Sequence, residues 1–417
     1  MISKFNQLIS KNFKLISFIF FYSTILIGFY LGENSTLGPK IDFFEHLKTL
    51  YSFDANLNYA LLNYDTIEYP TRISPIFLLY LFYLKKLFIN IDLMRFVSLN
   101  ICLLSPFVFY NALKIKFKYI DKNLLFFFSS FLYLSPSFRT NSIWPESSML
   151  GLLFFLFSVY FFLKFEKNKK FLFAVLNIIF LSLAAYIRPS YSLFALFFFI
   201  IFYKEYLVSY KTFVLFVLNI LLSLPAIYYL FILDIFFIST GGLSYNISNK
   251  ILVISSIIFL FLFPFLIIIF RSNKVEISFK KLFIFFIFYL TVYYYLVLNF
   301  SYDLNIAGGG FFLHLSNYLY NSNNIFFIVS FFAILSIIYL LCIDKKKNFL
   351  LILILFLFIP QTHIFHKYYD PLFIICLTLL FQVSIEKIFE KKLLFGLSLY
   401  FFSFYLINLL NSLFIKF

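Results

Sequence analysis

Long apolar runs, each near 20 residues, recur along this chain from its first segment to its last. An α-helix needs about 20 predominantly apolar residues to cross the hydrocarbon core of a bilayer. Hydrophobic residues make up 63% of the 417 positions and charged residues only 12%. The sequence therefore predicts an all-α integral membrane protein with many spans, and it excludes an ordinary soluble domain.

We expect about 13 transmembrane helices, at residues 15–31, 96–112, 123–138, 147–163, 171–187, 190–203, 212–233, 251–270, 282–299, 325–342, 348–362, 371–385 and 393–414. The apolar run at 73–90 is left out because only 12 uncharged residues separate Arg72 from Lys85. Runs of this length are better interpreted as helices that lie along the membrane surface.

The distribution of charge supports this assignment. With the N-terminus inside, the predicted inner loops and tail carry 23 of the 34 Lys and Arg residues. The outer side carries 11 of the 18 Asp and Glu residues and all four histidines. Basic residues concentrate on the cytoplasmic side of membrane proteins. The net charge of +16 is then a topology signal that requires no nucleic acid partner, and the C-terminus is expected outside.

Three local features complete this outline. The first span has basic flanks and no small-residue cleavage site, so we expect a retained signal anchor. The cysteines Cys102, Cys342 and Cys376 lie inside apolar spans and are expected to be unreactive thiols. Arg188 and Pro189 interrupt the apolar run at 171–203, which predicts a tight outer hairpin or a broken helix.

The longest polar interval runs from Gly38 to Pro75, directly after the first span, and holds five of the 18 carboxylates. Within it, Asp42, Glu45 and His46 form a DxxEH run. On a helix, the two carboxylates would share one face just above the membrane. We therefore expect the chemistry of this protein to take place in this loop.

Cations, carboxylates and imidazoles also recur at the outer ends of later spans, at Arg95, Arg139, Glu146, Arg188, His363, His366 and Lys367. The planar guanidinium group binds two phosphate oxygens at once, so this set predicts an outward-facing phosphate site beside an activating carboxylate. Simpler interpretations stay open: an interfacial anchor at Arg95, an Arg139–Glu146 ion pair, and solvated loop histidines. If helical, His363, His366 and Lys367 would share a face suited to a phosphate or a metal.

Together these segments resemble the GT-C superfamily of glycosyltransferases, which use polyprenyl-phosphate-linked sugars. The similar features are an acidic first outer loop ending in an aromatic-Pro segment, a short juxtamembrane helix, an Arg that opens the next span, a basic inner turn, and the stretches SPSFRTNSIWPES and YIRPSYSLF. The resemblance covers about residues 15–205 and is closest to bacterial protein-mannosyltransferase-type and lipopolysaccharide-sugar transferases. The stretch FRTNSIW is also similar to dolichyl-phosphate-glucose-dependent glucosyltransferases.

The chain departs from the family pattern at three places. Asp42 and Glu45 replace an adjacent pair of acids. Tyr69–Pro70 and Ser74–Pro75 stand where many relatives have His-Pro-Pro. Glu146 follows Arg139 by seven residues, where a spacing of five is usual in the family. The resemblance implies a GT-C-like bundle with a catalytic module at 1–210, including the outer loop at 32–95, and a variable module at 211–417.

The resemblance also implies an inverting sugar transfer. Asp42 would take the proton from the acceptor hydroxyl, and Glu45 and Glu146 would be further catalytic carboxylates. The residues expected to bind substrate are His46, Arg95, Arg139, Arg188, His363, His366 and Lys367, with the arginines on the leaving phosphate. No cofactor is required, although a divalent metal held by Asp42, Glu146 and His366 is compatible with the sequence.

The partners implied are a polyprenyl-phosphate sugar as donor, a lipid-linked glycan, lipopolysaccharide or protein as acceptor, and the lipids of a bacterial cytoplasmic (inner) membrane. The alternative is a lipid-linked polysaccharide polymerase or flippase, or a transporter. Polymerases usually carry their Arg and His residues in large late loops without an acidic first loop. Transporters tend to show two matching halves and charges at the bilayer midplane, whereas we find no internal repeat here.

Overall fold

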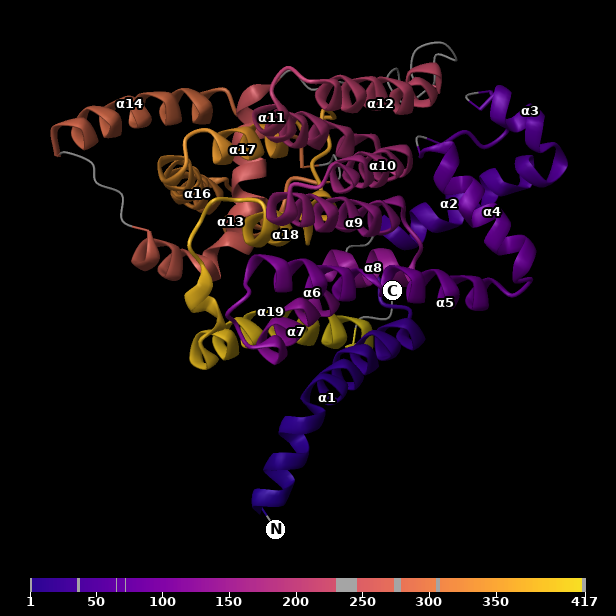
Figure 1. Cartoon of the computed structure of the whole chain (residues 1–417), viewed down its shortest axis with the longest axis horizontal. Helices are drawn as coiled ribbons and strands as arrows, with labels where there is room; N and C mark the ends of the chain where they lie inside the picture. The colour runs from indigo at the N-terminus through magenta and orange to yellow at the C-terminus, as the bar shows by residue number, and fades with distance from the viewer. Residues whose placement is uncertain are drawn as a thin grey trace. The chain divides into compact units, whose positions relative to one another are not determined.

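The structure is a computed structural model that describes residues 2–35, 38–64, 66–71, 73–229, 246–273, 279–304 and 308–414. The secondary-structure elements in these ranges are α-helices and 3₁₀ turns, as the apolar runs predict (Figure 1). The chain forms two compact units, one of Met1–Thr240 with Phe389–Phe417 and one of Gly241–Ile388. This division differs from the predicted modules at 1–210 and 211–417, because the C-terminal segment belongs to the first unit.

The helices of the first unit are α1 (Ile2–Leu31), α2 (Gly38–Ala55), α3 (Leu57–Leu62), α4 (Pro75–Leu87), α5 (Ile91–Cys102), α6 (Ser105–Lys116), α7 (Lys122–Ser129), α8 (Pro136–Ile143), α9 (Ser147–Asn168), α10 (Phe171–Ile187), α11 (Phe194–Tyr206), α12 (Tyr210–Ile227) and α19 (Lys391–Phe414). Two 3₁₀ turns, η1 (Ser130–Leu134) and η2 (Pro189–Leu193), connect them. The pair α9 and α10 packs along most of its length, and α19 returns to contact α1, η1 and α8.

The helices of the second unit are α13 (Ile247–Ser272), α14 (Phe279–Leu298), α15 (Phe311–Tyr320), α16 (Asn324–Ile343), α17 (Lys347–Leu357) and α18 (Leu372–Leu379), with the 3₁₀ turns η4 (His366–Tyr368) and η5 (Glu386–Phe389). Helix α13 is the centre of this unit, since α14, α15, α16, α17 and α18 all contact it.

Seven of the described helices are long and apolar enough to cross a membrane, at Asn12–Leu31, Ile91–Lys116, Ser147–Asn168, Tyr210–Ile227, Ile247–Ser272, Asn324–Ile343 and Lys391–Leu410. Shorter apolar helices lie at four other predicted spans, Lys122–Leu134, Phe171–Ile187, Ile284–Leu298 and Lys347–Leu357. The described residues are therefore helical as predicted, and their seven long apolar helices indicate a multi-pass membrane protein. The count of about 13 spans and the outward orientation of the first loop stay predictions.

The predicted helical span at 371–385 is wrong. Helix α18 has 8 residues, which is about 12 Å and too short to cross. After it, two asparagine side chains pair with the non-helical backbone. Asn348 accepts from the Gln382 N–H at 2.9 Å and donates to its carbonyl at 3.4 Å, and Asn273 does the same at Ser384, at 2.9 and 3.1 Å. Irregular backbone inside a membrane protein requires such internal partners.

The run at 73–90 forms the short helix α4, and its position along the membrane surface stays a prediction. This helix has 13 residues, about 20 Å, which is shorter than the roughly 30 Å of a bilayer core. Ser74 caps its first turn by accepting from the Ile76 N–H, and Pro75 occupies the first helical position. Lys85 and Lys86 lie in the last turn, where cations interact favourably with the negative end of the helix dipole.

Helices α2 and α4 pack together through aromatic rings. The Phe53 ring of α2 lies 5.8 Å from Phe82 of α4 and 6.4 Å from Tyr64 in the connecting segment. An ion pair of 2.5 Å between Lys85 and Asp54 joins the two helices at their surface. The segment predicted to be the first outer loop therefore contains packed helices in its described residues and is not an open connection.

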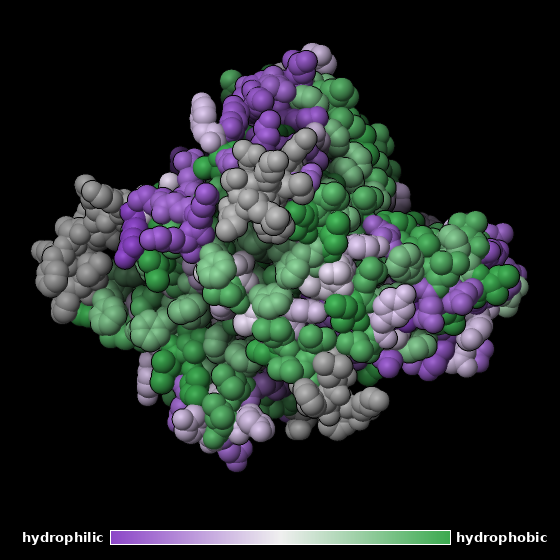
Figure 2. Space-filling model, turned by 90° about the horizontal axis from the view of Figure 1, so that it is seen from below, coloured by the Kyte–Doolittle hydropathy of each residue, from purple (hydrophilic) through white to green (hydrophobic). Residues whose placement is uncertain are grey.

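Large hydrophobic side chains are exposed on many helices, and Figure 2 shows broad hydrophobic areas on the face that it presents. Helix α14 exposes Ile284, Phe288 and Leu298 by 59%, 65% and 65%. Apolar patches of this extent are rare on soluble monomers, which agrees with a lipid-facing surface.

Candidate active site

The end of α1 turns the chain toward α8. The Glu33 N–H donates to the Gly28 carbonyl at 2.8 Å, and the Gly32 N–H donates to the Phe29 carbonyl at 3.2 Å. These two bonds form a Schellman motif, which needs a left-handed residue, and Gly32 has φ of +64°. The motif ends α1 and directs the Glu33 side chain back into the protein.

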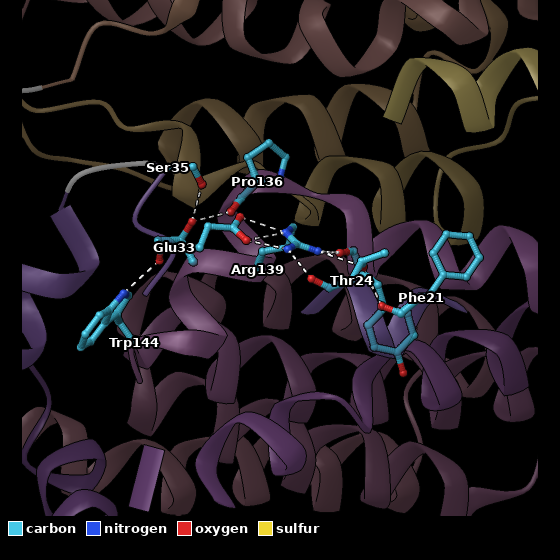
Figure 3. A network of polar contacts seen from close by, with 9 residues as sticks. Phe21, Thr24, Glu33, Ser35, Pro136, Arg139 and Trp144 are labelled. Atoms are coloured by element: carbon cyan, nitrogen blue, oxygen red, sulfur yellow. Dashed lines mark hydrogen bonds and ion pairs between the residues drawn. The ribbon is translucent and has the colours of Figure 1, made fainter. Parts of the chain in front are cut away.

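Glu33 meets Arg139 of α8 in a fully buried ion pair (Figure 3). The Arg139 Nη2 atom lies 2.5 Å from Glu33 Oε2, and Arg139 Nε donates to the same carboxylate at 2.9 Å. The remaining N–H groups of Arg139 donate to the Thr24 hydroxyl, the Thr24 carbonyl and the Tyr133 carbonyl, at 3.1, 2.9 and 3.0 Å. The Tyr405 ring of α19 lies 4.6 Å from the guanidinium carbon.

This geometry changes the interpretation of Arg139. The sequence predicted either a phosphate or Glu146 as the partner of Arg139, and neither prediction included Glu33. Because protein acceptors take all five N–H groups of Arg139, this side chain offers no hydrogen bond to a ligand in this structure. The signal for Glu33 was present in the sequence, since an acid directly after an apolar span needs a partner when it is buried.

Trp144, at the end of α8, is a point where several segments meet. Its Nε1–H donates to the Glu33 backbone carbonyl at 2.9 Å. From α2, the Phe43 and Phe44 rings lie 6.0 and 5.9 Å from it, and the Lys40 ammonium lies 5.4 Å over the ring. The side chain is 5% exposed. Helix α2 is therefore packed directly against the stretch that follows Arg139.

Arg95 of α5 stacks on the same indole. Its guanidinium carbon lies 3.5 Å over the Trp144 ring and 4.9 Å over the Phe29 ring. Its Nε donates to the Ile143 carbonyl at 3.2 Å, and its Nη1 donates to Asp92 at 2.8 Å. Its Nη2 is buried and has no hydrogen-bond partner in the described part of the chain. Arg95 therefore differs from Arg139, because one of its nitrogens is left for a ligand.

The three first-loop candidates have different surroundings on α2. Asp42 is half-buried, one residue before Phe43. Glu45 is exposed and forms a surface ion pair of 2.6 Å with Lys48. His46 is buried, and its ring meets the Phe77 ring of α4 edge-on at 5.8 Å. Asp42 therefore lies in the half of α2 that contacts Trp144, but on a different face from Phe43 and Phe44. His46 belongs to the packing between α2 and α4.

Glu146 begins α9, where it is the N-cap residue and is 3% exposed. Arg188 is half-buried at the C-terminal end of α10, where the predicted helix break is confirmed by the turn η2. The two ends are neighbours at Gly151, because a Cβ atom there would lie 3.5 Å from the Arg188 Cβ and 3.0 Å from the Tyr191 ring.

Helix α4 connects the surroundings of the two arginines. The Tyr80 hydroxyl donates to Ser98 at 3.0 Å, one turn from Arg95 on α5. The Ser74 hydroxyl donates to the Tyr186 carbonyl, two residues before Arg188. The elements that carry Asp42, Arg95, Glu146 and Arg188 are thus linked within the first unit through contacts of α4, Trp144 and Gly151.

The remaining candidates lie in the second unit, and they do not share a helical face. Only His366–Tyr368 form a 3₁₀ turn, and His363 precedes it. The condition for a shared helical face of His363, His366 and Lys367 is therefore not met. The Nε2 atom of His366 accepts from the Phe311 N–H at 2.6 Å, at the start of α15.

Three consecutive glycines lie next to this histidine, at the start of α15. Gly308, Gly309 and Gly310 have φ of +109°, +87° and +82°, values that residues with a Cβ rarely adopt. His314 donates from Nε2 to the Gly308 carbonyl at 2.6 Å. Burial of the His366 imidazole, together with the nearby His314, lowers the pKa of His366 to about 4. A neutral His366 is what its acceptor role requires.

Within the described ranges, no group of three or more His, Cys, Asp or Glu residues is placed to hold a metal ion. The divalent metal that the sequence allows therefore has no preformed ligand set among those residues. The cysteines are free, and Cys102 and Cys376 are buried.

No protein-family model, curated protein or solved structure matches this chain. The functional interpretation accordingly rests on the geometry above and on the sequence motifs.

Proposed function

We propose that this chain is a membrane glycosyltransferase of the GT-C type. It moves a sugar from a polyprenyl-phosphate donor to a lipid-linked glycan, a lipopolysaccharide or a protein, on the outer face of a bacterial inner membrane. The observation that carries the proposal is the meeting at Trp144. The helix that bears Asp42 and the incompletely paired guanidinium group of Arg95 pack against the same indole. The two residues are the base and the phosphate ligand that an inverting transfer from a lipid phosphate requires.

In this proposal, Arg95 binds the leaving phosphate through Nη2, the nitrogen that has no protein acceptor. A hydrogen bond between charged groups is stronger than a neutral one, and a buried guanidinium gains more from it than an exposed one. Arg188 follows Tyr186, whose carbonyl accepts from Ser74 at the N-terminus of α4, and it supplies the second cation. Arg139 has a different role, because its N–H groups are all taken: it holds the end of α1 against α8.

Asp42 is the proposed general base. It lies in the half of α2 that contacts Trp144 and is half-buried. Glu45 and Glu146 differ from it. Glu45 is paired with Lys48 at the surface, and Glu146 caps α9. Their contacts fit positioning roles better than proton transfer.

The test is a transfer assay on purified protein in lipid nanodiscs, with a panel of polyprenyl-phosphate sugars as donors. Asp42→Asn keeps the size of the side chain and removes its ability to take a proton. We expect turnover to fall by about 10²–10⁴-fold, the usual contribution of general-base catalysis, with donor binding unchanged. Glu45→Gln, three residues away on the same helix, is the matched control and should cost less than about tenfold.

Two results would contradict the proposal. The absence of sugar transfer from every donor in the panel by well-folded protein would remove the glycosyltransferase assignment. Near-normal turnover by Asp42→Asn at saturating donor and acceptor would move the base elsewhere, with Glu146 as the next carboxylate to test.

A further inference from the structure

The aromatic contacts of Trp144 indicate a structural role for this residue that the sequence motifs did not predict. It is the only tryptophan of the chain, and three segments far apart in the sequence converge on it. The end of α1 accepts its N–H, α2 covers it with Phe43 and Phe44, and α5 lays Arg95 over its face. Among the described rings, Trp144 is the one that contacts both α2, the helix of Asp42, and the Arg95 guanidinium group.

The contacts of Arg95 define how its guanidinium group is held. Two aromatic rings, Trp144 and Phe29, lie against it, and two of its nitrogens donate to Ile143 and Asp92. These contacts fix the plane of the group and leave Nη2 as the one nitrogen without a hydrogen-bond partner in the described residues. A guanidinium group held in this way can donate a hydrogen bond from Nη2 to an oxyanion in one defined direction.

We propose that Trp144 is a positioning residue that sets the Arg95 guanidinium group for the phosphate of the lipid-linked substrate and couples it to the helix that carries Asp42. This inference rests on the proposed function, because it assumes that Arg95 binds the phosphate. The indole touches neither the sugar nor the phosphate. It acts through Arg95, whose charge it stabilises by a cation–π contact in a desolvated site.

Lys40 supplies an internal comparison. Its ammonium lies over the same ring at 5.4 Å, but its side chain is exposed. Water and salt screen an exposed charge, so the contact of Lys40 with the indole is expected to matter little for phosphate binding. The effect of Trp144 on an anionic ligand is therefore expected to pass through Arg95.

The experiment measures the binding of radiolabelled undecaprenyl phosphate to the full chain in nanodiscs, with undecaprenol as the control ligand that lacks the phosphate. Trp144→Leu removes the aromatic face, and we expect the dissociation constant to rise about tenfold to 30-fold, the equivalent of a desolvated cation–π contact. Trp144→Phe keeps an aromatic face and should change it by less than about fourfold. Lys40→Gln should change it by a similarly small factor.

A double-mutant cycle separates positioning from general structure. In an Arg95→Ala background, which already binds undecaprenyl phosphate weakly, Trp144→Leu should cause no further loss. An equal loss in both backgrounds, or no loss from Trp144→Leu alone, would overturn the positioning role and leave the proposed function intact. Unchanged binding by Arg95→Ala would overturn both, because the phosphate would then lie elsewhere.

A second measurement does not depend on the Leu variant folding. Emission from the wild-type chain comes from Trp144 alone among its tryptophans, and the guanidinium group lies 3.5 Å from its ring. Undecaprenyl phosphate should therefore change the tryptophan emission of the wild type, whereas undecaprenol should not. The same emission change with undecaprenyl phosphate and with undecaprenol, or no change with either ligand, would contradict the inference.

Discussion

Removal of the Arg139 charge tests whether the Glu33–Arg139 pair fixes the first unit. The Arg139 side chain is 0% exposed and that of Glu33 is 4% exposed. Arg139→Gln leaves a buried carboxylate without its cation. Breaking one side of a buried pair costs about 3–5 kcal/mol, because the remaining charge keeps its desolvation penalty and loses its partner. We expect the free energy of unfolding to fall by that amount.

Two further variants decide whether burial is the cause. The Lys85–Asp54 pair has the same 2.5 Å separation, but its side chains are 28% and 40% exposed, so Asp54→Asn should cost less than about 1 kcal/mol. The double change Glu33→Leu with Arg139→Met removes both charges together. Apolar replacement of a buried pair is often neutral or stabilising, so this variant should regain most of the loss.

The assay is titration of the protein with SDS in mixed micelles, followed by the fluorescence of Trp144. Since the Trp144 N–H donates to the Glu33 carbonyl at 2.9 Å, the signal comes from the immediate surroundings of the pair. Similar losses for Arg139→Gln and Asp54→Asn would refute the reasoning. So would a double variant as unstable as Arg139→Gln, because its instability would then come from lost packing and not from an uncompensated charge.

Two other predictions concern the second unit, and a control variant for the first of them, at Gly396, lies in α19 of the first unit. Gly308→Ala places a Cβ 2.7 Å from the Tyr302 hydroxyl and 2.8 Å from the Ile364 carbonyl, at a φ of +109°. This variant should lower the free energy of unfolding by about 1–3 kcal/mol. Circular dichroism during denaturation measures the loss. Gly396→Ala, with open space around its Cβ, should be neutral or stabilising by up to about 1 kcal/mol. Because the pKa of His366 is about 4 in the folded chain, against an ordinary value of 6.5, the unfolded chain binds this proton first as the pH falls. Stability should therefore decrease from pH 6.5 toward 4, and His366→Gln, which retains an acceptor for the Phe311 N–H, should reduce that slope.

Local signals in the sequence predicted the elements that depend on local chemistry. Ser74–Pro75 and the Lys85–Lys86 pair bound a short apolar run, and α4 begins at Pro75 and ends one residue after Lys86. Arg188–Pro189 breaks the apolar run at the expected place, because proline cannot supply the N–H that a continuous helix needs. Apolar length alone was enough for the class of fold, since the bilayer sets the length of a helix.

Pairing between distant residues was not accessible in the same way. Glu33 and Arg139 are separated by 106 positions, and no periodicity connects them. The same limit applies to Asn348 and Gln382, whose contact replaces helix with irregular backbone after α18. An apolar run predicts burial, but the state of the buried backbone depends on which polar side chain reaches it.

The buried ion pair and the proposed phosphate site are linked by α8. Arg139 holds this helix against the end of α1, and the carbonyl of Ile143, one turn later, accepts the Nε–H of Arg95. Trp144 follows at once and stacks on the same guanidinium. A shift of α8 would therefore move an acceptor and an aromatic face of Arg95 together. For this reason, a change at Glu33 should alter donor binding although this residue offers the substrate no contact, whereas Glu45→Gln, at the exposed surface of α2, should not.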